Sequence, residues 1–545
     1  MSSADRRAAA VIFTAAACIQ FFYMLTLPIS LPIDSFDYIR IAANPFVPDA
    51  NVVRTPGYPL LVAAAGVPAL DSALPVVVLQ LLLGAAIPVL AFYTVRDAGL
   101  AAAWTAAGLM LTFQYAYTMP LQVMTETVYL FGSVGVLCLL GIFLRRGTYG
   151  WLLACVGAIA ATAEVRPSAT LLYAAIPFTL AVRAIAKPHA RAIKQLAVGT
   201  VIALVMIVGR GFVTERNSGN IGPFFVWHWM APCELPDGSS CVATTNGAST
   251  ARFFEVVAQL LKQHRDFYDA MASARDVRGA PAGIRPEFID YSDASIDRLV
   301  EDLQTNTAQN NHRGPHMVLA LWNYLGVNRT GELLRPVIVE TLFAHPGIAR
   351  ELADRFLFAL FIPGNMITRD DGFYMVLHDN VYWPFVPHSL SERGLLDTFP
   401  GGASLYAEWL HGLERRTGRD PAAKSGYGHV PESWTEAREA LDRYGNRSAI
   451  ALYLGGLLTR TTVAFVCVAS LVLLPFVFAS GQRLLGITVF LVSWGLILTS
   501  FFSQTTFRMI LLHAPGLFVV VALGIDGVQR LGARLLSGRV RGEAT

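Results

Sequence analysis

Long apolar runs are the feature of this 545-residue sequence that most limits its fold. Hydrophobic residues make up 54% of the chain and charged residues only 15%, and nearly uncharged stretches of about twenty residues recur. An α-helix of that length crosses the roughly 30 Å hydrocarbon core of a bilayer. The sequence therefore predicts an all-α polytopic membrane protein with about ten transmembrane helices and a mainly α-helical extracytoplasmic domain. The predicted spans are residues 9–29, 75–95, 99–118, 123–144, 150–165, 167–186, 195–213, 453–480, 484–502 and 508–528.

Cationic residues predict the orientation of these spans. They gather at one set of span ends: Arg6, Arg7, Arg96, Arg145, Arg146, Arg183, Lys187, Arg191, Lys194, Arg483, Arg530, Arg534, Arg539 and Arg541. Loops rich in Lys and Arg generally stay on the cytoplasmic side. We therefore expect a multi-pass protein of the inner (plasma) membrane with both termini in the cytoplasm.

The chain divides into three predicted parts. Residues 1–213 form an N-terminal module of seven spans with a first outer loop at 30–74, and residues 453–545 form a C-terminal module of three spans with a basic cytoplasmic tail. Between them, residues 214–452 carry 29 of the 39 acidic residues, which predicts an extracytoplasmic soluble domain. The stretch "ARFFEVVAQLLKQHRDFYDAMA" in this region has the apolar spacing of an amphipathic helix.

The six cysteines separate into two groups. Four lie in predicted spans, where free cysteine behaves as a small hydrophobic residue: Cys18, Cys138, Cys155 and Cys467. Cys233 and Cys241 flank "ELPDGSS", whose Pro-Asp-Gly signals a turn, and a disulfide there suits an oxidising compartment. Two unpaired thiols are the alternative.

Two ligand classes find no support in the sequence. No CxxC or His/Cys cluster indicates a metal site, and a net charge of +3 is too small to indicate nucleic acid. The expected partners are the lipid bilayer and the substrates considered below.

The first outer loop concentrates ionisable groups beside the membrane, where charge is costly. It contains "PIDSFDYIRIAANPFVPDANVVRTPGYPLLVA", with Asp34 and Asp37 three residues apart. Arg54, Arg166 and Arg508 are all predicted at outer span ends, where positive charge is otherwise sparse. Convergence of these arginines would form an anion site at the depth of a lipid headgroup, because a guanidinium can engage two phosphate oxygens.

Several motifs together resemble a known family. The pattern D-x-x-x-Y at Asp34 and Tyr38, followed by R-x-P-G-Y-P-L at 54–60, resembles the first extracytoplasmic loop of type-C glycosyltransferases. The likeness is to the protein mannosyltransferase and aminoarabinose transferase-like branch. Three further fragments resemble parts of that family: "MTETVYL" at 124–130, "EVRPSA" at 164–169 and "FRMILLHAPGLFVVV" at 507–521.

The resemblance implies transfer of a sugar from a polyprenyl-phosphate donor to an extracytoplasmic glycan, lipid or protein acceptor. A carboxylate of the loop serves as the base in that family, and Asp34 holds its position. Ser35 stands where the family often has a second acidic residue, so the division of roles between Asp34 and Asp37 is open. The lipid phosphate can leave without a proton, so one base acting on the acceptor suffices, and a single displacement inverts the anomeric centre.

The resemblance also suggests substrate-binding residues: Tyr38, Arg54, Tyr58, Arg166 and Arg508. Each candidate has an ordinary alternative. Asp34 is also placed to cap a helix, Asp37 to support it, the arginines to reach phospholipid headgroups and the tyrosines to lie at the membrane interface.

Two other functions remain open from the sequence. One is an O-antigen polymerase or ligase type enzyme that uses diphosphate-linked glycans. The other is a non-enzymatic lipid-sugar transporter or scaffold. The sequence predicts no certain cofactor and leaves open whether a divalent cation bridges carboxylate and donor phosphate.

Overall fold

The structure is a computed structural model. It describes residues 2–26, 33–43, 55–70, 72–186, 190–217, 223, 226, 227, 230, 233, 235, 240–265, 268, 292–305, 307–348, 350, 435, 438, 448–503 and 511–542.

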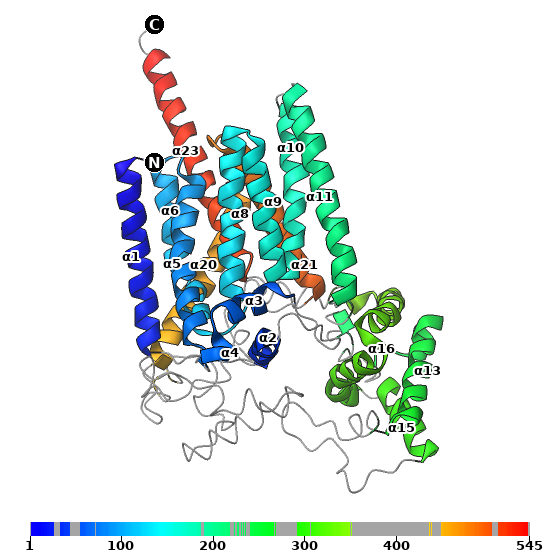
Figure 1. The fold of residues 1–545 in the computed structure, drawn as a ribbon. Coiled ribbons are helices and arrows are strands. Elements are labelled where there is room, and N and C mark those ends of the chain that lie inside the picture. Colours follow the sequence, from blue (N-terminus) through cyan, green and yellow to red (C-terminus); the bar gives the residue numbers. More distant parts are fainter. Residues whose placement is uncertain are drawn as a thin grey trace.

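A bundle of long apolar helices dominates the fold (Figure 1). Its helices are α1 (Ser3–Thr26), α5 (Leu74–Val95), α6 (Leu100–Leu111), α8 (Glu126–Arg146), α9 (Tyr149–Val165), α10 (Ala175–Ala186), α11 (Ala190–Asn217), α20 (Ser448–Val477), α21 (Arg483–Ser503) and α23 (Ala514–Gly542). Within the described residues, seven helical segments are long and apolar enough to cross a membrane. Three shorter apolar helices accompany them, at Leu100–Leu111, Tyr149–Val165 and Arg483–Leu498. The multi-pass helical character is confirmed, while the count of about ten spans stays a prediction.

The bundle has two chemically distinct ends. At the basic end lie the start of α1, the turn between α8 and α9, and the last turns of α23 (Figure 1). The start of α1 and the end of α23 therefore lie on the same side of the bundle. At the opposite loop end lie the short helices α2 (Ile33–Ala43), α3 (Gly57–Ala64), α4 (Val67–Leu70) and η2 (Pro167–Ala174).

The two membrane modules predicted from the sequence share one hydrophobic core. Helix α23 packs against α20 and also against α6 and α5 of the N-terminal module. Phe518 of α23 meets Phe113 edge to face, with ring centroids 5.5 Å apart, and both side chains are fully buried. The C-terminal helices are thus part of the bundle that positions the loop end.

One predicted span is interrupted. The sequence predicts a single helix over 99–118, whereas α6 stops earlier and is followed by α7 (Tyr115–Thr118) and a short 3₁₀ turn, η1 (Met119–Leu121). The side chains of this interruption are buried. Irregular backbone is tolerated at such a place when the protein satisfies its polar groups, and the N–H of Gln114 donates to the hydroxyl of Thr459 on α20 at 2.9 Å.

A smaller helical module lies beyond the loop end (Figure 1). It contains η3 (Thr244–Asn246), α13 (Ala248–Gln263), α15 (Asp293–Thr305) and α16 (Thr307–Ala344), which kinks at Gly326 where φ is +77°. The predicted amphipathic helix is confirmed by α13, whose apolar face enters a separate hydrophobic core. That core also contains Trp227, whose ring centroid lies 5.0 Å from that of Phe253.

Candidate active site at the loop end

Helix α2 carries both predicted carboxylates. The described residues of this helix are Ile33–Ala43, so Asp34 and Asp37 lie near its described beginning, three residues apart. A carboxylate near the start of a helix interacts favourably with the helix dipole, and the capping role expected for Asp34 stays a prediction. The side chains of Asp34 and Asp37 lie outside the described part of the structure, so the direction in which they point stays a prediction.

Ser35 fastens α2 to the bundle. Its side chain is fully buried, and its hydroxyl donates to the carbonyl oxygen of Val123 at 2.8 Å. Val123 lies just before Glu126, the first residue of α8. Ser35 stands where the resembled motif often has an acidic residue, and its hydroxyl gives it a structural role here. A hydroxyl can donate to a carbonyl oxygen, whereas an ionised carboxylate cannot.

A second fastening lies beside the predicted Arg-x-Pro-Gly-Tyr motif. The hydroxyl of Thr55 donates to the carbonyl oxygen of Val165 at 3.1 Å. Gly57 packs directly on the backbone of Glu164, and a methyl group on Gly57 would lie 2.5 Å from that carbonyl oxygen. These contacts hold the residue after Arg54 against the residue before Arg166. Arg54 itself lies outside the described residues.

Arg166 and Glu126 form a buried ion pair. Nη1 of Arg166 donates to Oε1 of Glu126 at 3.0 Å and to the hydroxyl of Thr125 at 3.2 Å. The Glu126 side chain is 0% exposed and that of Arg166 is 16% exposed. Pro167 favours extended backbone before it, and Arg166 indeed has φ −147° and ψ 123°, so α9 ends here.

Tyr38 and Tyr58 lie inside the loop end. Tyr58 is fully buried, and its hydroxyl donates to Oε1 of Gln80 at 2.6 Å. Burial raises the pKa of Tyr58 well above its usual value, which keeps the hydroxyl protonated as a donor. Its ring meets that of the buried Tyr38 edge to face at 4.9 Å. In this structure both tyrosines support the loop from within, and their predicted contact with sugar stays untested.

Gln80 links this tyrosine pair to the interruption between α6 and α8. Its Nε2 donates to the carbonyl oxygens of Pro120 at 2.9 Å and Gln122 at 2.7 Å. Gln80 is fully buried in α5. One side chain thus satisfies two carbonyl groups that a continuous helix would have satisfied within itself.

His513 brings the C-terminal segment to the same place. Its Nδ1 lies 3.3 Å from the hydroxyl of Tyr129, and both side chains are buried. The guanidinium carbon of Arg166 lies 5.9 Å from the centre of the Tyr129 ring. His513 is therefore a buried histidine with a hydrogen-bond partner in the core. Arg508, five residues earlier in the chain, lies outside the described residues.

The described residues therefore bring several predicted stretches together at one end of the bundle. Segments 33–43, 55–58, 122–129, 164–168 and 511–513 are joined by the contacts above. Sequence reasoning missed Gln80, Thr125 and Tyr129. For Gln80 a signal existed, because it is the one amide side chain in the apolar run "LPVVVLQLLLGAAIPVL".

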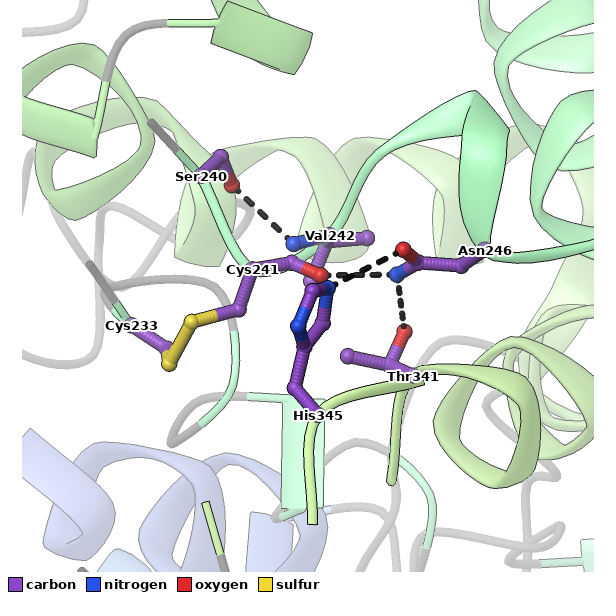
Figure 2. Close-up of a disulfide and its surroundings, with 7 residues drawn as sticks. All are labelled: Cys233, Ser240, Cys241, Val242, Asn246, Thr341 and His345. Carbon is purple, nitrogen blue, oxygen red and sulfur yellow. Dashed lines mark hydrogen bonds between the residues drawn. A yellow bond between two sulfur atoms is a disulfide. The ribbon is translucent and has the colours of Figure 1, made fainter. Parts of the chain in front are cut away.

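The predicted disulfide between Cys233 and Cys241 is present in the smaller module (Figure 2). Asn246 donates from Nδ2 to the carbonyl oxygen of Cys241 at 2.7 Å and to the hydroxyl of Thr341 at 3.1 Å. Nε2 of His345 lies 3.2 Å from Oδ1 of Asn246. The disulfide and this amide together fix the loop before α13 to the end of α16.

The described residues form no candidate metal site. No group of three or more His, Cys, Asp or Glu residues among them is arranged to hold a metal ion. The carboxylates of Asp34 and Asp37 lie outside the described residues, so a divalent cation at α2 stays untested.

Comparison with known proteins adds no assignment. No model of a protein family matches the chain, and no curated protein matches it.

Proposed function

We propose that this protein is an integral membrane glycosyltransferase. It moves a sugar from a polyprenyl-phosphate carrier to an extracytoplasmic acceptor by a single inverting displacement. In this proposal Asp34 accepts the proton of the attacking acceptor group, and arginines hold the departing phosphate.

The observation that carries the proposal is the fastening of the motif-bearing segments to one another. The residue after Asp34 is tied to the segment before Glu126, and the residue after Arg54 is tied to the residue before Arg166. These contacts bring the segments next to Asp34, Arg54 and Arg166 to one end of the bundle, which supports a shared site for the predicted base and the predicted phosphate ligands.

The ion pair between Arg166 and Glu126 distinguishes the proposed role of Arg166 from those of the other two arginines. Glu126 balances the charge of Arg166, so Arg166 is held as a rigid hydrogen-bond donor and adds little net positive charge. A departing phosphate needs net positive charge around it. We therefore assign charge compensation to Arg54 and Arg508 and orientation of the phosphate to Arg166.

The test replaces the proposed base. Cells that lack the protein are complemented with wild type, Asp34→Asn or Asp37→Asn, and their envelope glycans are compared by mass spectrometry. Asp34→Asn should abolish the modification because an amide cannot accept the proton at neutral pH. Asp37→Asn makes the same change on the same helix and tests how the two carboxylates divide their roles: loss of the modification in Asp37→Asn but not in Asp34→Asn would assign the base to Asp37. Full complementation by Asp34→Asn would remove Asp34 from the mechanism.

The interruption between α6 and α8 favours one second candidate, a lipid-sugar transporter, because such proteins build substrate sites from broken helices. Purified protein in vesicles separates the two functions. A transferase releases polyprenyl phosphate when donor and acceptor are supplied, whereas a transporter moves the intact lipid-linked sugar across the membrane.

A further inference from the structure

The turn between α8 and α9 at the basic end gathers cationic side chains around one glycine. Gly147 closes α8 in the left-handed region, with φ +64°, and its N–H donates to the carbonyl oxygen of Phe143 at 2.7 Å. Its own carbonyl oxygen accepts from Nη2 of Arg191 at 3.0 Å and from Nε2 of Gln195 at 2.7 Å. The start of α11 is therefore docked on this turn.

Arg183 approaches the same glycine from the last turn of α10. Its Nη2 lies 3.1 Å from the position that a methyl group on Gly147 would occupy, so the guanidinium packs over the bare backbone. Its Nη1 is buried and has no hydrogen-bond partner within the described part of the chain. The turn is thus flanked by two guanidinium groups from different helices.

The protein supplies little negative charge here. The described carboxylates of the basic end are Asp5, Asp97 and Asp526, and each is paired with another arginine. Within the described residues, no ion pair reaches Arg183 or Arg191. Two guanidinium groups around one turn without a carboxylate favour an external anion.

The surroundings of the turn indicate where that anion comes from. Arg183 falls in the last turn of a candidate membrane span, Pro167–Ile185, which is the depth of lipid headgroups. Large apolar side chains beside the two arginines face outward, with Ile185 81% exposed and Ile193 58% exposed. A ligand with a phosphate and acyl chains would meet the guanidinium groups and cover these isoleucines, whereas free phosphate would leave them bare.

We propose that Arg183 and Arg191, arranged around Gly147, bind the phosphate of an anionic phospholipid. The site lies at the opposite end of the bundle from the candidate active site and does not depend on the proposed function. Its ligand is a structural lipid with acyl chains lying along α10 and α11.

The experiment measures lipid retention. The purified full-length protein in detergent is mixed with phosphatidylglycerol or zwitterionic phosphatidylcholine, and bound lipid is counted by native mass spectrometry. Wild type should retain phosphatidylglycerol in preference to phosphatidylcholine. The variant Arg183→Gln/Arg191→Gln should bind phosphatidylglycerol about tenfold or more weakly, the scale expected for losing hydrogen bonds between charged groups.

Controls separate this site from general attraction of anions to the basic end. Arg6→Gln/Arg7→Gln removes the same charge from exposed positions on α1 and should retain the lipid as wild type does. Equal loss in both double variants, or no preference in wild type, would overturn the proposal. Displacement of the lipid by millimolar inorganic phosphate would overturn the lipid assignment. Thermal unfolding of each variant checks that the bundle is intact. If Arg183→Gln/Arg191→Gln alters the bundle, the variant Arg183→Lys/Arg191→Lys, which keeps both positive charges, replaces it in the test. The lysine variant should bind more phosphatidylglycerol than the glutamine variant does.

Discussion

Two ion pairs, one at each end of the bundle, differ in how deeply they are buried. At the loop end, Glu126 is 0% exposed and Arg166 is 16% exposed. At the basic end, Arg145 and Asp97 are 34% and 52% exposed. Burying a carboxylate costs several kcal/mol that its partner must offset, whereas an exposed pair changes stability by about 0–1 kcal/mol. The buried pair fixes a geometry at the loop end, whereas the exposed pair contributes little to stability.

Replacing Glu126 gives the largest expected difference between the ends. Glu126→Ala leaves the Arg166 guanidinium buried without its carboxylate, which should lower the free energy of unfolding by about 3–5 kcal/mol. Asp97→Ala at the basic end should change it by no more than about 1 kcal/mol. Denaturant unfolding in micelles, followed by tryptophan fluorescence, measures both. Equal shifts for the two variants would show that burial does not distinguish the pairs.

Removing one tyrosine hydroxyl at each end should have an intermediate effect on stability. Tyr58→Phe removes the donor to the buried Gln80 and should cost about 1–3 kcal/mol, because Oε1 of Gln80 is then unsatisfied. Tyr93→Phe is the matched control, since its hydroxyl donates to the carbonyl oxygen of Asp5 in a partly buried place at the basic end. Thermal unfolding of both variants should show the larger decrease for Tyr58→Phe. A larger decrease for Tyr93→Phe would contradict the contrast between the ends.

The smallest expected effect is a loss of stability of the smaller helical module at low pH. Glu340 accepts hydrogen bonds from the backbone of Ser249 and Thr250 at the start of α13. Partial burial opposes ionisation, but these bonds and those from the side chains outweigh it and lower the pKa of Glu340 from 4.5 to about 2. The carboxylate therefore stabilises the module fully above about pH 4.5, and this contribution is lost as the pH falls towards 2.

Hydrogen exchange of α13 at pH 6 and pH 3 measures that loss. Protection corrected for the intrinsic exchange rate should fall at pH 3 in wild type. Glu340→Gln should lower stability at pH 6 by about 1 kcal/mol, as loss of a helix cap does, and should remove the acid dependence caused by this group. Unchanged protection in the variant at pH 6 would show that Glu340 is not the cap of α13.

Much of the helical architecture follows from local composition. Helices α5, α8 and α11 lie close to their predicted spans because a long apolar run permits little else in a membrane. The interruption after α6 was not predicted, because its backbone is satisfied by Gln80 and Thr459, which lie far away in the chain. No local pattern encodes such partners.

In the candidate site, too, the sequence predicted local features but not the contacts between distant segments. The motifs predicted that Arg166 matters, but they did not predict the ion pair that holds it. Arg166 pairs with Glu126, forty residues earlier, in the stretch "MTETVYL" that the sequence offered only as a fragment resembling the family. Pairing between distant segments depends on how helices pack, and a single sequence does not record it. Thr55 was not predicted for the same reason, and Ser35 was noted only for the acidic residue that it replaces.

The fastenings of the loop have a practical consequence. Ser35 and Thr55 hold the loop in place, and neither carries an ionisable group. The contacts that fix the loop are therefore separate from the side chains proposed to react, so a substitution at Asp34 should leave the loop in place. If the proposed function holds, purified Asp34→Asn protein would keep its lipid-linked donor bound and would allow that donor to be captured and identified.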